Sequence, residues 1–492
     1  MRALKKSSFV IGSLSLIGAS SIVFTSCSHT LSLNEKLTNV VPDGTVYENI
    51  FATEFSFLFQ NSGGKSFDGQ NKNPYNTYGT GWLFDYELDN NKNPEKWVGY
   101  FGTNLHVADS LLNPKEENDK YRPSYLSATG SNDGLDKTIG FYLGKFDNFS
   151  KSALSSVKVN ENDIESDMTY VPLSNIPTTQ YAAIDFYRGG NPVDDPSAND
   201  KTYVDFAVLK ITLDLKNENE KLVHEKWIKR SIESIDQTSK PKRNLSAFDN
   251  WRPETRDESM FWREEWSNVY LDSQQQMLKK YRAFIGGYPY VSTNRAPKFI
   301  KDTTDSDPSQ NLKHGSPRWT INVDEKSANP AEQNGQKFDY QNISPSYGFY
   351  GSFKHVYGAY LAEDKYYDFT YTYHGQKYRQ TGWGFIVHDS NLSGGSSGSM
   401  LMNQDKQIMG IYFGTFMRRN EETNFGLVQS LIMTESFARE ATLASKLKVK
   451  PYDLIAGDQN TNYSYKTSLN KTKTFLFDSP QEENVPNEEV KP

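Results

Sequence analysis

The sequence contains a single cysteine in 492 residues, Cys27. A chain with one cysteine cannot form an internal disulfide, so its stability must come from the size of its core. Basic residues are also in deficit, because 54 Lys and Arg oppose 61 Asp and Glu and give a net charge of −7. A protein of this charge lacks the basic footprint typical of nucleic-acid binding. We therefore expect neither a disulfide-braced fold nor a nucleic-acid partner.

Two short motifs resemble binding sites but lack a residue that each site needs. Gly63-Gly64-Lys65-Ser66 is similar to the end of a phosphate-binding loop, but Phe59 stands where that loop requires its first glycine. His224 and Glu225 begin a pattern typical of zinc sites, yet no second histidine follows four residues after the first. The sequence therefore predicts no metal ion and no cofactor.

The chain begins with an export signal. Basic residues among the first six precede an apolar run from Phe9 to Phe24, which leads into Thr25-Ser26-Cys27. Small residues before a lone cysteine resemble a bacterial lipobox, so residues 1–27 are predicted to be a lipoprotein signal peptide. Cleavage before Cys27 would leave this cysteine lipidated and tether the protein to the extracellular face of the cell membrane. The alternative is an uncleaved membrane anchor with an incidental cysteine.

Aromatic residues are abundant, with 30 Tyr and 29 Phe, and they favour β-structure. Two strand-like runs, one at 79–86 and one beginning at Trp97, are separated by an Asn/Lys/Pro turn and predict a β-hairpin. His106 lies just beyond the second run, where a scaffold can present a side chain. The apolar stretch 46–60 fits a helix or a strand, and residues 28–45 before it are expected to form a tether.

A stretch of small residues, Gly394-Gly395-Ser396-Ser397-Gly398-Ser399-Met400, lies between two apolar, strand-like runs. This setting predicts a sharp turn that leaves N–H groups free. Acyl transfer requires such a turn, with Ser397 as the nucleophile and the N–H groups at and just before it facing the oxygen that becomes negative. The alternative interpretation is a flexible Gly/Ser linker.

An acid that could orient a histidine heads another apolar strand, 203–211. Asp205 is the candidate for a buried carboxylate that stabilises a charged imidazole. Its alternative role is that of an ordinary strand-end or loop aspartate. Asp109 and Asp214 are the competing acids, and Asp109 is expected to cap a helix that follows His106.

The remaining segments are assigned from composition and periodicity. Residues 214–237 are rich in Lys and Glu and predict an amphipathic helix, and Phe425 to Leu447 predicts a second, C-terminal one. Residues 291–345 form a long polar insertion. The acidic tail 478–492 is expected to be disordered.

Three blocks in this order resemble the trypsin/chymotrypsin-like serine peptidases: Thr103-Asn104-Leu105-His106-Val107, then Asp205-Phe206-Ala207-Val208-Leu209-Lys210-Ile211, then Gly395-Ser396-Ser397-Gly398-Ser399. With the lipobox and Gly79-Thr80-Gly81-Trp82, they are also similar to the peptidase lipoproteins of mycoplasmas, a family that includes an immunoglobulin protease. The resemblance implies a mostly β fold, namely a trypsin-like double β-barrel with large insertions and helical additions. The first barrel would span residues 46–240 with the histidine and aspartate. The second would span 241–477 with the serine, the insertion 291–345 and the C-terminal helix.

The resemblance also implies a role for each residue of the three blocks. Ser397 would attack the scissile carbonyl, His106 would take and return its proton, and Asp205 would hold the imidazole tautomer. The N–H groups of Gly395 and Ser397 would form the oxyanion hole.

Two positions depart from the trypsin-like pattern. Ser396 replaces the aspartate that receives a freed N-terminus in trypsin-like zymogens, so activation by N-terminal clipping is not expected. The floor of the primary specificity pocket falls near Asn391, a neutral residue, with Phe413 and Thr415 at the walls.

These residues predict a cell-surface serine endopeptidase that cleaves host protein. The resemblance suggests immunoglobulin as the substrate and an antibody-capturing protein as a partner. The alternative is a non-catalytic surface lipoprotein that binds host protein such as immunoglobulin on a peptidase-like fold. The insertion 291–345 and the aromatic-rich loops motivate this second hypothesis, because Tyr and Trp suit binding surfaces.

Overall fold

The structure is a computed structural model of the chain. It describes residues 44–64, 70, 73–88, 94–112, 136–146, 168–190, 201–237, 284–288, 318–319, 332–333, 336–337, 343–349, 352–354, 370–373, 376–390, 392, 394–402, 408–417, 424–433, 435, 438 and 448–477. The predicted signal peptide 1–27 and the tail 478–492 lie outside these residues, as does most of the tether and of the insertion 291–345.

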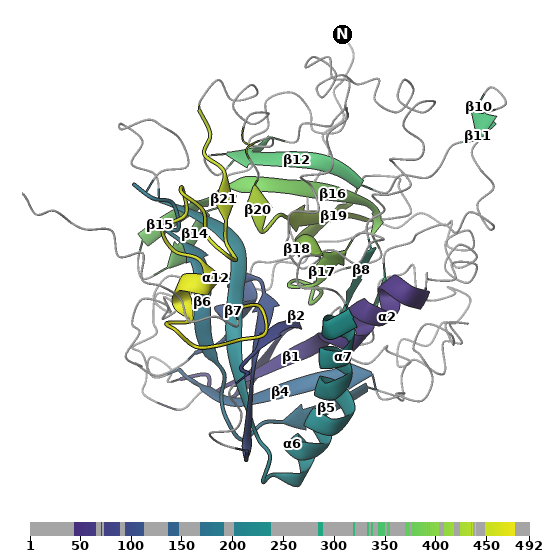
Figure 1. The fold of residues 1–492 in the computed structure, drawn as a ribbon, viewed down its shortest axis with the longest axis vertical. Coiled ribbons are helices and arrows are strands. Elements are labelled where there is room, and N and C mark those ends of the chain that lie inside the picture. Colours follow the sequence, from purple (N-terminus) through teal and green to yellow (C-terminus); the bar gives the residue numbers. More distant parts are fainter. Residues whose placement is uncertain are drawn as a thin grey trace, which may run out of the picture.

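A nine-stranded sheet has strands β1, β2, β4 and β5 in the lower half of Figure 1, while β14 and β15 extend it at the upper left. The strands of this sheet are hydrogen-bonded in the order β14-β15-β7-β3-β2-β1-β4-β5, and β6 also pairs with β7. Every pair is antiparallel except β15 with β7. The strands are β1 (Glu54–Asn61), β2 (Tyr75–Tyr86), β3 (Lys96–Thr103), β4 (Thr138–Phe146), β5 (Met168–Pro172), β6 (Thr178–Ile184), β7 (Thr202–Asp214), β14 (Thr370–Tyr373) and β15 (Gln376–Gln380).

An eight-stranded sheet lies above it in the same view, in the order β13-β12-β16-β19-β18-β17-β8-β9. Two further sheets have two strands each, β10 with β11 and β20 with β21. The strands are β8 (Phe284–Gly287), β9 (Arg318–Trp319), β10 (Glu332–Gln333), β11 (Gln336–Lys337), β12 (Ile343–Phe349), β13 (Ser352–Lys354), β16 (Gly382–Ser390), β17 (Met400–Met402), β18 (Ile408–Met417), β19 (Asn424–Gln429), β20 (Ile432–Met433) and β21 (Tyr452–Asp453).

Helices lead into and follow the first sheet. The stretch 46–60, which fitted a helix or a strand, contains both, because α2 (Gly44–Thr53) runs directly into β1. The helix predicted at 214–237 is confirmed as α6 (Glu218–Val223), the π-turn η3 (His224–Ile228) and α7 (Lys229–Gln237). Among the helices of the described residues, none has the length and apolarity needed to cross a bilayer.

Two apolar clusters form the core. Phe55, Phe57 and Phe59 alternate along β1, so all three point to one face and are fully buried in a cluster within the first sheet. The second cluster joins the two sheets, since it contains Trp82 of the first and Met400 of the second. The segment Gly394–Ser399 immediately precedes Met400, so the candidate nucleophile lies where the sheets meet.

The predicted helix from Phe425 to Leu447 is wrong in its first part. Residues 424–429 form β19, which pairs with both β16 and β18. A strand between two partners satisfies its main-chain hydrogen bonds on both sides, and this pairing outweighs the helical spacing of its apolar residues. Most of residues 434–447 lie outside the described part of the chain.

The fold class is mostly β, as predicted. The described pairings give two large sheets, and the closure of each sheet into a barrel stays a prediction. The division at residues 240 and 241 falls in the undescribed range 238–283. Strands β14 and β15 come from the C-terminal half of the chain yet complete the first sheet.

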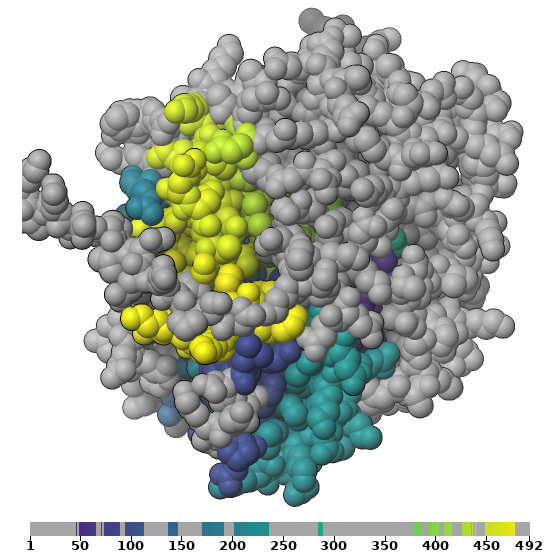
Figure 2. Space-filling view, in the orientation of Figure 1, coloured from purple at the N-terminus to yellow at the C-terminus, as the bar shows by residue number. Residues whose placement is uncertain are grey.

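The segment 448–477 crosses from the second sheet to the first. Its β21 pairs with β20, and isolated bridges join Thr461 to Tyr187 and Thr474 to Glu87. Figure 2 shows this segment (yellow) at the surface beside residues of the first sheet (blue). It contains the short helix α12 (Tyr465–Ser468), whose Tyr465 is fully buried. The end of the described chain thereby holds the two sheets together.

Candidate active site

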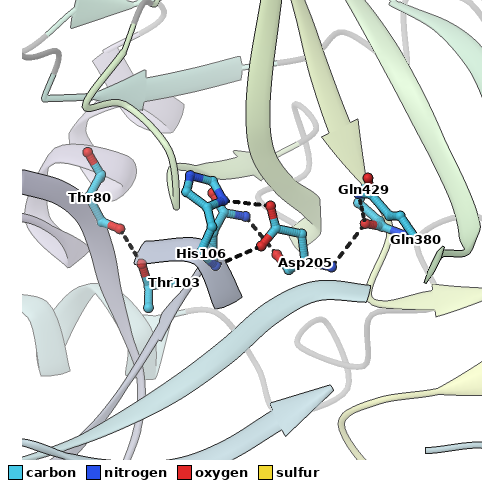
Figure 3. A network of polar contacts seen from close by, with 7 residues as sticks. Thr80, Thr103, His106, Asp205, Gln380 and Gln429 are labelled. Carbon is cyan, nitrogen blue, oxygen red and sulfur yellow. Dashed lines mark hydrogen bonds and ion pairs between the residues drawn. The ribbon is translucent and has the colours of Figure 1, made fainter. Parts of the chain in front are cut away.

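His106 and Asp205 form a close pair at the end of two neighbouring strands. The predicted hairpin is confirmed as β2 and β3, and the chain after β3 turns into α3 (Leu105–Ala108), which carries His106. The ring Nδ1 of His106 lies 2.7 Å from Asp205 Oδ2, and the His106 main-chain N–H donates to Oδ1 over 3.1 Å. Figure 3 shows the imidazole facing the carboxylate. One residue thus holds both the main chain and the ring of the histidine.

The burial of the pair favours a strong interaction. The side chain of Asp205 is 8% exposed and that of His106 is 21% exposed, so the carboxylate is shielded while the ring keeps access to solvent. Asn104 donates from Nδ2 to the Asp205 carbonyl oxygen over 2.7 Å, which ties the start of α3 to β7. With Nδ1 directed at a carboxylate, the ring presents Nε2 for proton transfer.

The competing acids have other positions. Asp109 is the C-cap of α3, so it ends the helix that contains His106 and does not begin a later one, contrary to our expectation. The expectation was wrong because the helix is a single turn that begins at Leu105, just after β3. It already contains His106, so Asp109 stands at its C-terminal end. Asp214 lies at the far end of β7 and accepts the Lys216 N–H over 3.0 Å.

The residues around Ser397 form a buried, hydrogen-bonded turn. Gly395 and Gly398 have φ angles of +94° and +96°, which glycine adopts readily. The Ser399 N–H and hydroxyl both donate to the Ser396 carbonyl oxygen, over 3.0 and 2.6 Å. Ser397 is 4% exposed. These contacts exclude the flexible-linker interpretation of this stretch.

Gly398 also makes a close approach that only glycine permits. A Cβ at this position would lie 1.9 Å from the carbonyl oxygen of Thr80 and 2.5 Å from Oγ1 of Thr103. Thr103 stands three residues before His106, and Gly398 directly follows Ser397. This contact therefore places the serine turn beside the segment that carries the histidine.

Thr80 connects the serine turn to the first sheet. Its N–H donates to the Ser397 carbonyl oxygen over 2.8 Å, and its hydroxyl donates to the Gly395 carbonyl oxygen over 3.1 Å. The same hydroxyl accepts the Tyr288 N–H over 3.1 Å. Thr103 donates from its hydroxyl to the Thr80 carbonyl oxygen over 2.7 Å, as Figure 3 shows. The sequence contained the Gly-Thr-Gly-Trp motif but gave no sign of this role for its threonine.

The N–H groups of the serine turn that are expected to bind the oxyanion remain available for it. Within the described residues, neither the Gly395 N–H nor the Ser397 N–H donates a hydrogen bond, and an oxyanion hole requires such available donors. No hydrogen bond joins the Ser397 hydroxyl to His106 in the same part of the chain. Such bonds are often long before substrate binds. Asn391, expected at the pocket floor, lies outside the described residues.

A buried carboxyl that sequence reasoning missed supports the strand after the serine. Glu54 of β1 accepts the Met400 N–H on Oε1 over 2.7 Å, and burial raises the pKa of Glu54 well above its ordinary value. Lys145 is equally buried and donates to the carbonyl oxygens of Ala52 and Glu54. Among the described residues no three His, Cys, Asp or Glu side chains are grouped to hold a metal ion.

Several known proteins are similar to this chain. An uncharacterised lipoprotein of Mycoplasmoides gallisepticum is 32% identical over 483 residues, which cover 88% of this chain and 79% of the relative. Uncharacterised lipoproteins of Mycoplasma genitalium and Mycoplasma pneumoniae are 26% and 25% identical, over 82% and 91% of this chain and 74% and 89% of their own length. These names agree with the lipid anchor predicted at Cys27.

A solved structure described as that of the mycoplasma MIB and MIP proteins is similar with 18% identity and a TM-score of 0.47. The match covers 83% of this chain and 60% of the solved chain. The model of one protein family, described as mycoplasma immunoglobulin protease, matches residues 44–414, which include His106, Asp205 and Ser397. The chain therefore belongs to the mycoplasma immunoglobulin protease family.

Proposed function

We propose that the protein is a lipid-anchored serine endopeptidase that acts on host protein outside the cell. The observation that carries the proposal is the double contact of Asp205 with the main chain and the ring of His106. In peptidases that use a Ser-His-Asp triad, this contact fixes the imidazole tautomer and stabilises the charged ring. A purely structural histidine does not need a carboxylate bound to both its ring and its main chain. The double contact beside the serine turn therefore favours a role for His106 in proton transfer.

The proposed reaction is peptide hydrolysis in two steps. The Ser397 hydroxyl attacks the scissile carbonyl carbon while His106 Nε2 accepts its proton, and the resulting oxyanion is stabilised by the N–H groups of Gly395 and Ser397. His106 then gives the proton to the leaving amine. Water repeats the sequence on the acyl-enzyme and frees Ser397.

Immunoglobulin is the substrate that the family description supports first. We propose that the enzyme cleaves antibody at the cell surface, with the antibody held by a capturing partner protein, as the resemblance to the mycoplasma lipoproteins implies. The trypsin-like double barrel belongs to the same proposal. It is supported by the order of the three sequence blocks and by the position of the serine turn between two β-sheets.

Fluorophosphonate labelling tests the proposal. The unaltered protein should be labelled on Ser397, and Ser397→Ala should abolish both the label and the cleavage of intact antibody, with a loss of several orders of magnitude in turnover. Ser396→Ala is the matched control, because the buried Ser396 hydroxyl has no hydrogen-bond partner in the described part of the chain. This variant should be labelled normally.

The outcomes separate the two functional hypotheses. Antibody cleavage that depends on Ser397, alone or only with the capturing partner present, supports the endopeptidase. Tight antibody binding without labelling or hydrolysis, unchanged in Ser397→Ala, would instead establish a non-catalytic binder.

A further inference from the structure

The main-chain N–H of Asp205 is bound by a side chain from the other sheet. It donates to Oε1 of Gln429 over 3.1 Å, although Gln429 lies on β19 and Asp205 on β7. The neighbours of Asp205 along β7 are paired within the first sheet, Tyr203 with Gln380 and Ala207 with Thr103. A buried N–H in a strand is ordinarily satisfied by the next strand. Here the amide oxygen of Gln429 replaces that partner.

The amide of Gln429 is fixed in one orientation. Besides the Asp205 N–H, its Oε1 accepts Nε2 of Gln380 over 2.7 Å, and its Nε2 donates to the Thr381 carbonyl oxygen. Reversing the amide would turn its NH₂ group toward the two N–H donors and its oxygen toward the Thr381 carbonyl oxygen. These contacts therefore decide that Oε1 faces Asp205. Gln429 is fully buried and Gln380 is 1% exposed, so water does not compete for these groups. Figure 3 shows both glutamines beside Asp205.

The bond completes the fixation of Asp205. The carboxylate oxygens of Asp205 both contact His106, and its carbonyl oxygen accepts from Asn104. The N–H is the remaining polar group of the residue, and Gln429 binds it. All polar groups of Asp205 are then engaged, and the direction of the carboxylate depends on the second sheet as well as the first.

We propose that Gln429 is a positioning residue that sets the main chain of Asp205 so that its carboxylate meets His106. The inference rests on the proposed peptidase function for its catalytic consequence, but the geometry of the pair can be measured without activity. Gln429 touches neither substrate nor the reacting atoms. It acts through Asp205, in a buried chain of contacts that begins at Gln380.

Replacement of Gln429 by leucine tests this role in the full chain. Gln429→Leu keeps the size of the side chain but removes its acceptor, so kcat should fall by about 10- to 100-fold with KM nearly unchanged. The Nδ1–H proton resonance of His106, which reports its hydrogen bond to Asp205, should shift or disappear. The resonance is assigned by its absence from His106→Gln, in protein labelled with nitrogen-15 histidine.

Three further variants separate positioning from stability. Gln429→Glu keeps an acceptor for the Asp205 N–H and should restore part of kcat and of the resonance, whereas Gln380→Leu, which leaves the Asp205 bond in place, should change both less than Gln429→Leu does. Val428→Ala removes buried apolar volume on the same strand and changes no polar group of the site. It should therefore lower stability and leave kcat unchanged. If Gln429→Leu does not fold, Gln429→Asn carries the same measurements, because it withdraws the amide by one methylene.

The results distinguish this inference from the proposed function. If the unaltered protein resists fluorophosphonate labelling, the proposed peptidase function is wrong. Even then, loss of the His106 resonance in Gln429→Leu would establish that Gln429 positions the His106–Asp205 pair. A resonance and a kcat that both stay as in the unaltered protein would overturn the role of Gln429.

Discussion

The hydroxyl of Thr80 donates to the carbonyl oxygen of Gly395 over 3.1 Å, and 315 positions of the chain separate these two residues. The bond fixes the glycine whose N–H would bind the oxyanion. In the trypsin-like fold that we propose, Ser396 takes the position of the aspartate that binds a freed N-terminus in zymogens. The folded chain itself thus supplies the support, from the first sheet, and we expect no activation by N-terminal cleavage.

Thr80→Val should weaken the serine turn. The change keeps the shape of the side chain but removes both the donor to Gly395 and the acceptor of the Tyr288 N–H. A buried polar group that loses its partner costs about 1–3 kcal/mol of stability. Fluorophosphonate labelling should slow because the oxyanion groups are less well fixed. Thr77→Val on the same strand is the control, since the buried Thr77 hydroxyl has no partner among the described residues. Equal labelling rates in both variants would contradict this role of Thr80.

Gly398→Ala should abolish labelling. The added methyl would lie 1.9 Å from the Thr80 carbonyl oxygen, and the φ angle of +96° is strained for alanine, so the turn must move. Gly394→Ala, four residues earlier, meets no atom within 4 Å at its Cβ and should be labelled normally. Mass-spectrometric quantification of labelled Ser397 measures both. Normal labelling of Gly398→Ala would mean that the turn adapts without loss.

Asp205→Asn should reduce turnover by about 10³- to 10⁴-fold with little change in folding. The amide can still accept the His106 main-chain N–H, so the geometry survives, but it no longer offers a charged acceptor to the ring Nδ1. The comparison of kcat with the melting temperature checks this expectation. Asp109→Asn is the control, because Asp109 lies at the end of α3 and should affect turnover little. A large fall in melting temperature that accompanies the loss of activity would indicate a structural role for Asp205 instead.

Asp85 should make stability depend on pH. Its carboxylate is buried and accepts the Tyr465 hydroxyl over 2.8 Å and the Leu476 N–H over 3.0 Å, which ties the segment 448–477 to β2. Burial raises the pKa of Asp85 from 3.8 to about 6. Between these values the folded protein holds a proton that the unfolded chain releases, so the free energy of unfolding should fall as pH rises from about 4 to 6. Each unit of pKa shift corresponds to about 1.4 kcal/mol.

Urea denaturation at several pH values, compared with Asp85→Asn, measures this contribution. The amide does not titrate, so the difference in stability between the two proteins should change across this pH range and level off above it. Tyr465→Phe should cost more at pH 7 than at pH 4, because a hydrogen bond to a charged acceptor is the stronger one. Parallel pH profiles for the unaltered protein and Asp85→Asn would show that Asp85 does not carry the effect.

Local sequence predicted the elements whose pattern is strong and whose partners are near in the chain. The hairpin of β2 and β3, the strand that carries Asp205 and the helix at 214–237 were all predicted correctly. Strand β19 was mistaken for a helix because its identity depends on β16 and β18, which its own residues do not reveal. The contacts of Thr80, Glu54 and Gln429 were missed for the same reason, since each joins segments that are hundreds of residues apart.

By itself the sequence determined the family and the chemical identity of the candidate residues, because residue types and their order are properties of the chain, and it predicted the export signal. Only the tertiary structure decided that Asp205, and neither Asp109 nor Asp214, contacts His106, and that the serine turn is bound to the first sheet. The physical reason is that a hydrogen bond depends on distance and direction within about 3 Å. Those are set by the packing of two sheets, which no local stretch of sequence encodes.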